Sequence, residues 1–227
     1  MAERMMITDE ILAAFLDGNV SGKEAEAILK AAVTDSSLRE FLSIAADVSD
    51  HPLQESSPLA ALAAEAPDGL CAVHCERYVL QCFGISKSVE ELVSYARSIG
   101  MIKAGGTPLA NVGNISEHYG LSVRKVFAPD IQAVEIALSD GSQVIAAVDV
   151  GELDPSRAEY EYLEDRIIGP RPDHCVVVLA CDLSADEVVC YDPSTGDIPV
   201  SLQVPVFLDA WNDSENYMVV VSGSRNF

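Results

Sequence analysis

The stretch DGLCAVHCERYVLQCFG, residues 68–84, carries the strongest structural signal in this chain of 227 residues. A turn sequence, PDG at residues 67–69, leads directly into a predicted helix that has Cys71 in its first turn. Helical spacing puts four residues on one face of this helix: Cys71, Cys75, Val79 and Cys82. The positive end of a helix dipole and the unpaired N–H groups of a first turn favour a thiolate, so we expect Cys71 to be reactive.

A candidate base and a candidate carboxylate lie far downstream, on two predicted neighbouring strands. His174 opens the apolar strand HCVVVLAC after a proline-rich loop, and Asp192 ends the next strand, VVCYDP. The two residues are 18 positions apart (192 − 174), the span of one hairpin, so antiparallel strands would place them side by side. A thiol, an imidazole base and a carboxylate that orients the base are a set suited to acyl transfer. We therefore treat Cys71, His174 and Asp192 as candidate catalytic residues.

The remaining pattern predicts helices first and strands later, which is typical of an α+β domain with an antiparallel sheet. Helical spacing predicts helices over residues 70–83, 88–98, 107–118, 129–139 and 204–211. Runs rich in β-branched residues predict strands over residues 121–127, 143–149, 174–181, 187–191, 198–202 and 217–221. We expect the acidic stretch 151–172 to be irregular, forming either a cleft rim that selects substrates or a solvated excursion.

Over residues 65–221 the chain resembles, motif by motif and in order, the papain-like cysteine peptidases related to the bacteriocin-processing (double-glycine leader) family. In that family a helix begins at a cysteine, has a small residue or cysteine four positions on, and closes with an aromatic-glycine pair. Cys71, Cys75 and Phe83-Gly84 match this spacing. The other matching stretches are GTPLANVGNISEHYGLSV (106–123), ALSDGSQVIAAVD (137–149), DHCVVVLAC (173–181), VVCYDPSTG (188–196), FLDAW (207–211) and YMVVV (217–221).

This resemblance implies a papain-like fold and activity on a peptide or protein substrate. It gives Cys71 the role of nucleophile, His174 that of general base and acid, and Asp192 that of the orienting carboxylate. The family has a glutamine six residues before the cysteine, which donates to the oxyanion, and a glycine directly after the cysteine. Here Glu65 and Ala72 stand at those positions, and a carboxylate at Glu65 would repel a developing oxyanion unless it were protonated.

Three regions are predicted along the chain: a small helical module over residues 1–48, a linker over 49–58, and the peptidase-like domain over 59–227. Helix caps in the module are predicted at Thr8 or Asp9, at Ser21 with Glu24 in a capping box, and at Asp35. In the third helix we expect four apolar residues to face inward: Leu38, Phe41, Leu42 and Ala45.

The module resembles the N-terminal helical domains of bacterial anti-sigma factors, although a generic helical hairpin is the alternative. The positions that hold zinc in many of those domains correspond to Ala31, Asp35 and Leu38, so we expect no zinc. The resemblance implies a protein partner that binds through residues 1–48.

Composition and charge exclude several classes of function. Hydrophobic residues make up 49% of the chain and charged residues 22%, which is typical of a globular protein. The net charge of −22 argues against nucleic acids and anionic membranes as partners. No apolar run reaches the roughly 18 residues of a membrane span. With no signal peptide expected, the six cysteines are predicted to be free thiols in the cytoplasm, with Cys75, Cys82, Cys175, Cys181 and Cys190 as core residues.

Two readings compete with catalysis. A metal site could be drawn from Cys71, His74, Cys75, His174 and Cys175. Because strand neighbours alternate, we expect His174 and Cys175 to point to opposite faces, so we predict neither metal nor cofactor. The second reading, favoured by Glu65, is a catalytically inactive papain-like module that acts through protein binding.

Overall fold

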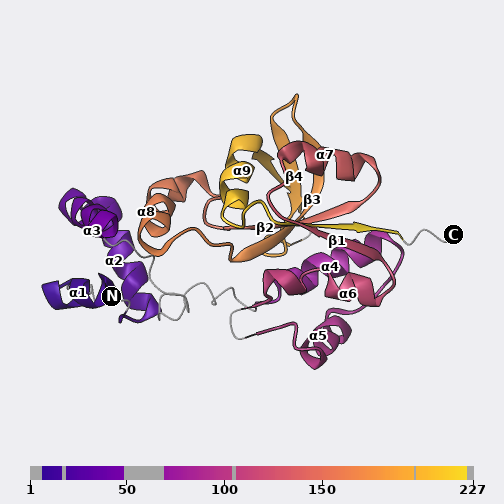
Figure 1. The fold of residues 1–227 in the computed structure, drawn as a ribbon, viewed down its shortest axis with the longest axis horizontal. Helices are drawn as coiled ribbons and strands as arrows, with labels where there is room; N and C mark the ends of the chain where they lie inside the picture. The colour runs from indigo at the N-terminus through magenta and orange to yellow at the C-terminus, as the bar shows by residue number, and fades with distance from the viewer. Residues whose placement is uncertain (1–6, 17–18, 49–68, 104–105, 197, 224–227) are drawn as a thin grey trace. The chain divides into compact units, whose positions relative to one another are not determined.

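The structure is a computed structural model that describes residues 7–16, 19–48, 69–103, 106–196 and 198–223. The chain divides into two compact units (Figure 1). The first comprises Met1–Glu65 together with Asp154–Arg171, and the second comprises Ala66–Leu153 together with Pro172–Phe227. The predicted linker, residues 49–58, lies outside the described residues, and the three predicted domain boundaries remain a prediction.

A six-stranded antiparallel sheet organises the described part of the second unit, which confirms the predicted α+β class. The strands lie in the order β1-β6-β2-β3-β4-β5. They are β1 (Ser122–Val126), β2 (Gln143–Val148), β3 (His174–Asp182), β4 (Glu187–Tyr191), β5 (Val200–Gln203) and β6 (Met218–Ser222). The central strands β2 and β3 are rich in valine and largely buried, because helices cover both faces of the sheet.

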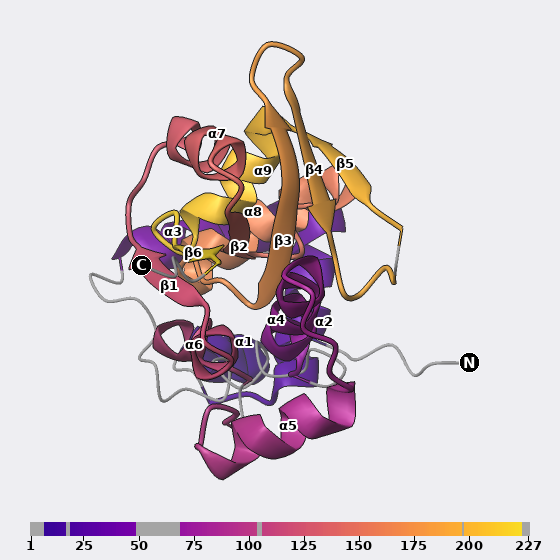
Figure 2. The same ribbon diagram turned by 90° about the vertical axis from the view of Figure 1, so that its right-hand side faces the viewer.

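Two hydrophobic cores lie on opposite faces of this sheet. Alternate residues of β3 contribute to each: Val177 packs with helices on one face and Val176 with helices on the other. The first face carries α4 (Cys71–Cys82), α5 (Val89–Ser98) and α6 (Asn114–His118), and the second carries α7 (Ile131–Ser139) and α9 (Val204–Asn212) (Figures 1 and 2). The face with α4 is the one that positions the candidate nucleophile.

The prediction of a single helix over residues 107–118 is wrong. A 3-10 turn, η2 (Leu109–Asn111), is separated from α6 by Gly113, whose φ of +94° lies in the left-handed region. A Cβ at Gly113 would lie 2.8 Å from a methyl of Val123 and 2.9 Å from one of Val219. Glycine is therefore required both for the backbone turn and for the close approach to the sheet.

The prediction that residues 151–172 are irregular is also wrong. A 3-10 turn, η3 (Pro155–Arg157), leads into α8 (Ala158–Ile168). Leu163 of this helix is fully buried in the hydrophobic core of the first unit. Most of the acidic residues therefore belong to a helix, in which the buried Leu163 stands among several glutamates.

The described part of the first unit packs α8 with α1 (Asp9–Leu16), α2 (Gly22–Thr34) and α3 (Ser36–Val48). The helix caps are confirmed: Thr8 Oγ1 accepts from Ile11 N, Ser21 and Glu24 form a capping box, and Asp35 accepts from two N–H groups of α3. The prediction for Phe41 is wrong, since its side chain is 47% exposed while Leu42 is fully buried.

The cysteines divide between core and surface. Cys75, Cys175 and Cys190 are buried as predicted, and Cys181 is half-buried and packs against the core. Cys82 is exposed in the last turn of α4, so its core prediction is wrong. All six thiols are free. Within the described residues, no helix has both the length and the apolarity needed to cross a membrane.

Candidate active site

Cys71 is the first residue of α4, as its sequence context predicts. The chain enters this helix through Gly69, whose φ is +59°, and a Cβ there would lie 3.3 Å from Gly106 Cα. The residue before the helix is Leu70, which has no polar side-chain atom with which to cap it. No side chain at Leu70 therefore bonds to the first-turn N–H groups. These groups form the positive end of the helix dipole, which lies beside Cys71.

His174 and Asp192 meet at the end of the sheet, where β3 begins and β4 ends. His174 Nε2 lies 2.7 Å from Asp192 Oδ1, and both side chains are buried. The same Asp192 oxygen accepts from Ser194 N at 2.8 Å and from Ser194 Oγ at 2.7 Å. These bonds fix the carboxylate, and the carboxylate in turn fixes the plane of the imidazole ring.

Helix α4 is held against this part of the sheet by two further contacts. Cys75 Sγ donates to Cys175 O at 3.2 Å. The rings of Tyr78 and Tyr191 stack with centroids 4.5 Å apart and an angle of 19° between their planes. Because Tyr191 directly precedes Asp192, the helix and the carboxylate are braced against each other.

The thiol of Cys71 is influenced by two neighbouring side chains, those of Cys175 and His174. The bond from Cys175 is the largest influence, and together with the bond and charge of His174 it outweighs partial burial, lowering the pKa of Cys71 to about 4. Burial alone would lower the pKa of His174. The hydrogen bonds to Asp192 and Cys71 instead raise it to about 10. A thiolate beside an imidazolium is therefore the stable state near neutral pH.

The sequence reasoning missed Cys175 as a neighbour of Cys71, because strand alternation assigned it to the face opposite His174. Cys175 packs with Val177 on the α4 face, as alternation requires. His174 is the first residue of β3, so its ring lies at the end of the sheet, where it also reaches Cys71. The interaction with Cys71 and, after it, burial raise the pKa of Cys175 well above its ordinary value, so Cys175 remains protonated.

Glu76 is a second residue that the sequence did not single out. Its carboxylate is fully buried and accepts from Gly113 N at 3.0 Å and from Ser116 N at 2.7 Å. Burial raises the pKa of Glu76 to about 7, against the opposing effect of these bonds. Glu76 therefore ties α4 to the start of α6, on the side of the helix away from the Cys71 thiol.

Some predicted site features lie elsewhere. Glu65, at the position expected for an oxyanion donor, lies outside the described residues. Ala72, where the resembling family has glycine, is fully buried. His74 is half-buried, and His118 lies at the end of α6, where its ring stacks on Tyr95 with centroids 4.0 Å apart.

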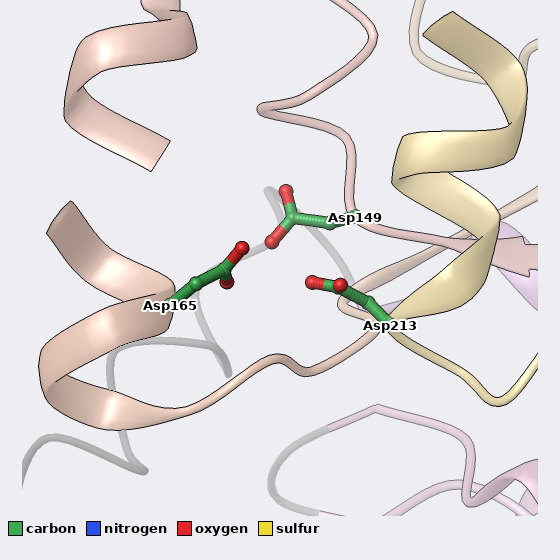
Figure 3. A group of neighbouring side chains, drawn as sticks. All are labelled: Asp149, Asp165 and Asp213. Carbon is green, nitrogen blue, oxygen red and sulfur yellow. The ribbon is translucent and has the colours of Figure 1, made fainter. Parts of the chain in front are cut away.

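An acidic pair lies within the second unit, at the ends of β2 and α9. One carboxylate oxygen of Asp149 and one of Asp213 lie within 4.8 Å of each other, and Figure 3 shows the two carboxylates close together. Asp149 Oδ1 also accepts from Gly151 N at 2.7 Å. Asp165, also drawn in Figure 3, belongs to the first unit. Two carboxylates are too few to define a metal site.

Comparison with known proteins adds evidence about the fold. A scan against protein-family models finds no match, and a search of curated proteins finds none. Among solved structures, the chain is similar to a proposed C39-like peptidase from Bacillus anthracis. The similarity has a TM-score of 0.52 and 14% sequence identity, and it covers 69% of this chain and 90% of the other. The fold is that of the papain-like cysteine peptidases. Nothing in these comparisons supports the resemblance of residues 1–48 to anti-sigma factors.

In this chain the candidate residues lie at the start of helix α4 and at the neighbouring ends of strands β3 and β4. At 14% identity the likeness concerns the fold alone, so the chemistry has to be argued from this chain's own side chains.

Proposed function

We propose that this protein is a cysteine peptidase, or a related thiol acyl-hydrolase, that acts on peptide or protein substrates. The observation that carries the proposal is the hydrogen bond between His174 and Asp192, together with the Cys71 thiol at the start of α4, which lies close enough to influence the pKa of His174. Each role follows from a contact: the thiolate is formed by its neighbours, the imidazole bonds to the thiol, and the carboxylate bonds to the imidazole.

In the proposed reaction the Cys71 thiolate attacks the substrate carbonyl carbon, and the carbonyl oxygen becomes an oxyanion. Backbone N–H groups in the first turn of α4 are the donors in this chain suited to that charge. The His174 imidazolium then donates its proton to the leaving amine, which leaves an acyl group on sulfur. Neutral His174 next takes a proton from water, whose attack on the thioester releases the acid and restores the thiolate.

Asp192 acts through His174. Because Asp192 Oδ1 engages Nε2, the other ring nitrogen, Nδ1, is the one available to Cys71. The carboxylate holds the ring in this tautomer and stabilises the imidazolium that the reaction needs.

The alternative, a papain-like binding module without catalysis, is motivated by Glu65 in the sequence. One experiment separates the two functions. Full-length protein is incubated with a peptide library derived from a proteome digest, and new termini are identified by mass spectrometry. We expect cleavage by wild type and by the control Cys82→Ala, which removes the exposed thiol of the same helix, and none by Cys71→Ala.

Cleavage that persists in Cys71→Ala would contradict the assignment of the nucleophile. If wild type does not cleave and its Cys71 titrates near the ordinary value of about 8.5, the non-catalytic module becomes the better account.

A further inference from the structure

Cys175 is a thiol in the candidate site that the proposed hydrolysis does not consume. It is 5% exposed, it directly follows His174 on β3, and it belongs to the core cluster against which Cys71 packs. Cys71 itself is half-buried, whereas Cys175 is buried.

Helix α4 holds Cys175 in this place. Cys71, in the first turn, packs against the core cluster that contains Cys175, and Cys75, one turn later, donates to the Cys175 carbonyl at 3.2 Å. Cys175 therefore lies alongside the first turns of the helix, and its thiol and that of Cys71 influence each other's pKa. The stack of Tyr78 on Tyr191 holds the same helix to the next strand.

We propose that Cys71 and Cys175 form a redox modification site: a peroxide oxidises Cys71, and Cys175 then converts the product to a reversible Cys71–Cys175 disulfide. The site goes beyond the proposed peptidase function, because it needs a reactive Cys71 thiolate but no peptide cleavage.

The chemistry balances with hydrogen peroxide as the oxidant. The Cys71 thiolate attacks one peroxide oxygen, the O–O bond breaks, and an S–O bond forms; sulfur loses two electrons and the peroxide gains them. The hydroxide that leaves takes a proton from the His174 imidazolium and becomes water. The Cys175 sulfur then attacks the sulfur of the Cys71 sulfenic acid, an S–S bond forms, and the departing hydroxide takes the Cys175 proton to give a second water.

Loss of the thiolate charge also prepares Cys175 for the second step. In the reduced protein the neighbouring Cys71 anion keeps Cys175 protonated. A neutral sulfenic acid removes that influence, so Cys175 gives up its proton more readily once Cys71 is oxidised. Forming the bond requires the two sulfurs to approach to about 2.05 Å.

Cys75 is the competing resolving thiol, and its geometry disfavours it. It is fully buried, and its S–H is already directed to the Cys175 carbonyl rather than to Cys71. Cys75→Ala is therefore a matched control for Cys175→Ala, because both remove a buried thiol from the same core.

The test treats the full-length reduced protein with hydrogen peroxide and maps the products by mass spectrometry before and after dithiothreitol. We expect wild type and Cys75→Ala to yield a peptide pair linked through Cys71 and Cys175, with the Cys71 thiol recovered on reduction. In Cys175→Ala we expect Cys71 to proceed to sulfinic and sulfonic acids, so that the recoverable fraction falls about tenfold or more. Cys175→Ser, which keeps the side-chain volume, should behave in the same way.

Two results on the wild-type protein alone would overturn the proposal. One is overoxidation of Cys71 without a disulfide to Cys175, and the other is a disulfide that joins Cys71 to Cys75. Equal recovery of Cys71 in wild type and in folded Cys175→Ser would also overturn it. A disulfide that forms in a protein with no peptidase activity would support this site and count only against the proposed function.

Discussion

His174 Nε2 lies 2.7 Å from Asp192 Oδ1, across neighbouring strands of the sheet. The contact joins the first residue of β3 to the residue that follows β4, so it exists only when the hairpin is correctly paired. Folding of the sheet and formation of the candidate imidazole–carboxylate pair are therefore one event.

Asp192→Asn should lower the pKa of His174, because the charged acceptor that raises it is lost. We expect a fall of about one unit or more from the value of about 10, measured by NMR titration of the imidazole ring. Asp209→Asn removes an exposed carboxylate from α9 and should leave the titration unchanged. An unaltered His174 in Asp192→Asn would mean that the contact does not control the base.

The thiolate of Cys71 should persist far below the pH at which ordinary thiols protonate. With a pKa of about 4 for Cys71, and about 10 for His174, the ion pair is lost as the pH falls through 4 or rises through 10. We expect site-specific labelling of Cys71 by iodoacetamide, followed by mass spectrometry, to be nearly constant between pH 5 and 8. A midpoint near 8.5 would contradict this.

Cys175 should contribute to that low pKa, since its hydrogen bond is the largest single influence on Cys71. Cys175→Ala is expected to move the labelling midpoint of Cys71 upward, and Cys175→Ser, which retains an O–H donor, should restore much of the shift. Cys75→Ala serves as the control, because the Cys75 thiol donates to the Cys175 carbonyl and not to Cys71. Equal midpoints in the Ala and Ser variants would show that burial, rather than the donor, is responsible.

Glu76 should make stability depend on pH. Folding raises the pKa of Glu76 from 4.5 to about 7, so its favourable contribution is complete below pH 4.5 and is lost as the pH rises through 7. The free energy of unfolding of Glu76→Gln should therefore fall furthest below wild type at low pH, with the gap narrowing toward pH 8. Urea denaturation at several pH values measures this difference, and Glu117→Gln, on the exposed surface of α6, is the control.

Gly113→Ala should cost much more stability than Gly141→Ala. Both glycines have positive φ values, +94° and +75°, but only a Cβ at Gly113 meets the sheet, 2.8 Å from Val123. We expect losses in the free energy of unfolding of about 3–5 kcal/mol for Gly113→Ala and about 1–2 kcal/mol for Gly141→Ala. Chemical denaturation measures these losses. Equal losses in the free energy of unfolding for the two variants would show that backbone strain alone is responsible.

Local sequence patterns determined most of the secondary structure, because caps, turns and hydrophobic periodicity act over a few residues. The capping box of Ser21 and Glu24, the boundaries of β4 and the helix beginning at Cys71 all follow from neighbours in sequence. The spacing of His174 and Asp192 was also enough to predict a hairpin that brings them together, because antiparallel pairing follows directly from a short connection.

Tertiary structure alone decided the features that depend on packing between distant segments. Gly113 ends a helical pattern because the sheet leaves no room for a side chain, and Leu163 orders an acidic stretch by filling a hydrophobic core. Cys175 became a neighbour of Cys71 because a helix packs on its strand face. The chain's local patterns indicated the candidate residues, and long-range packing determined which of them lie close to one another.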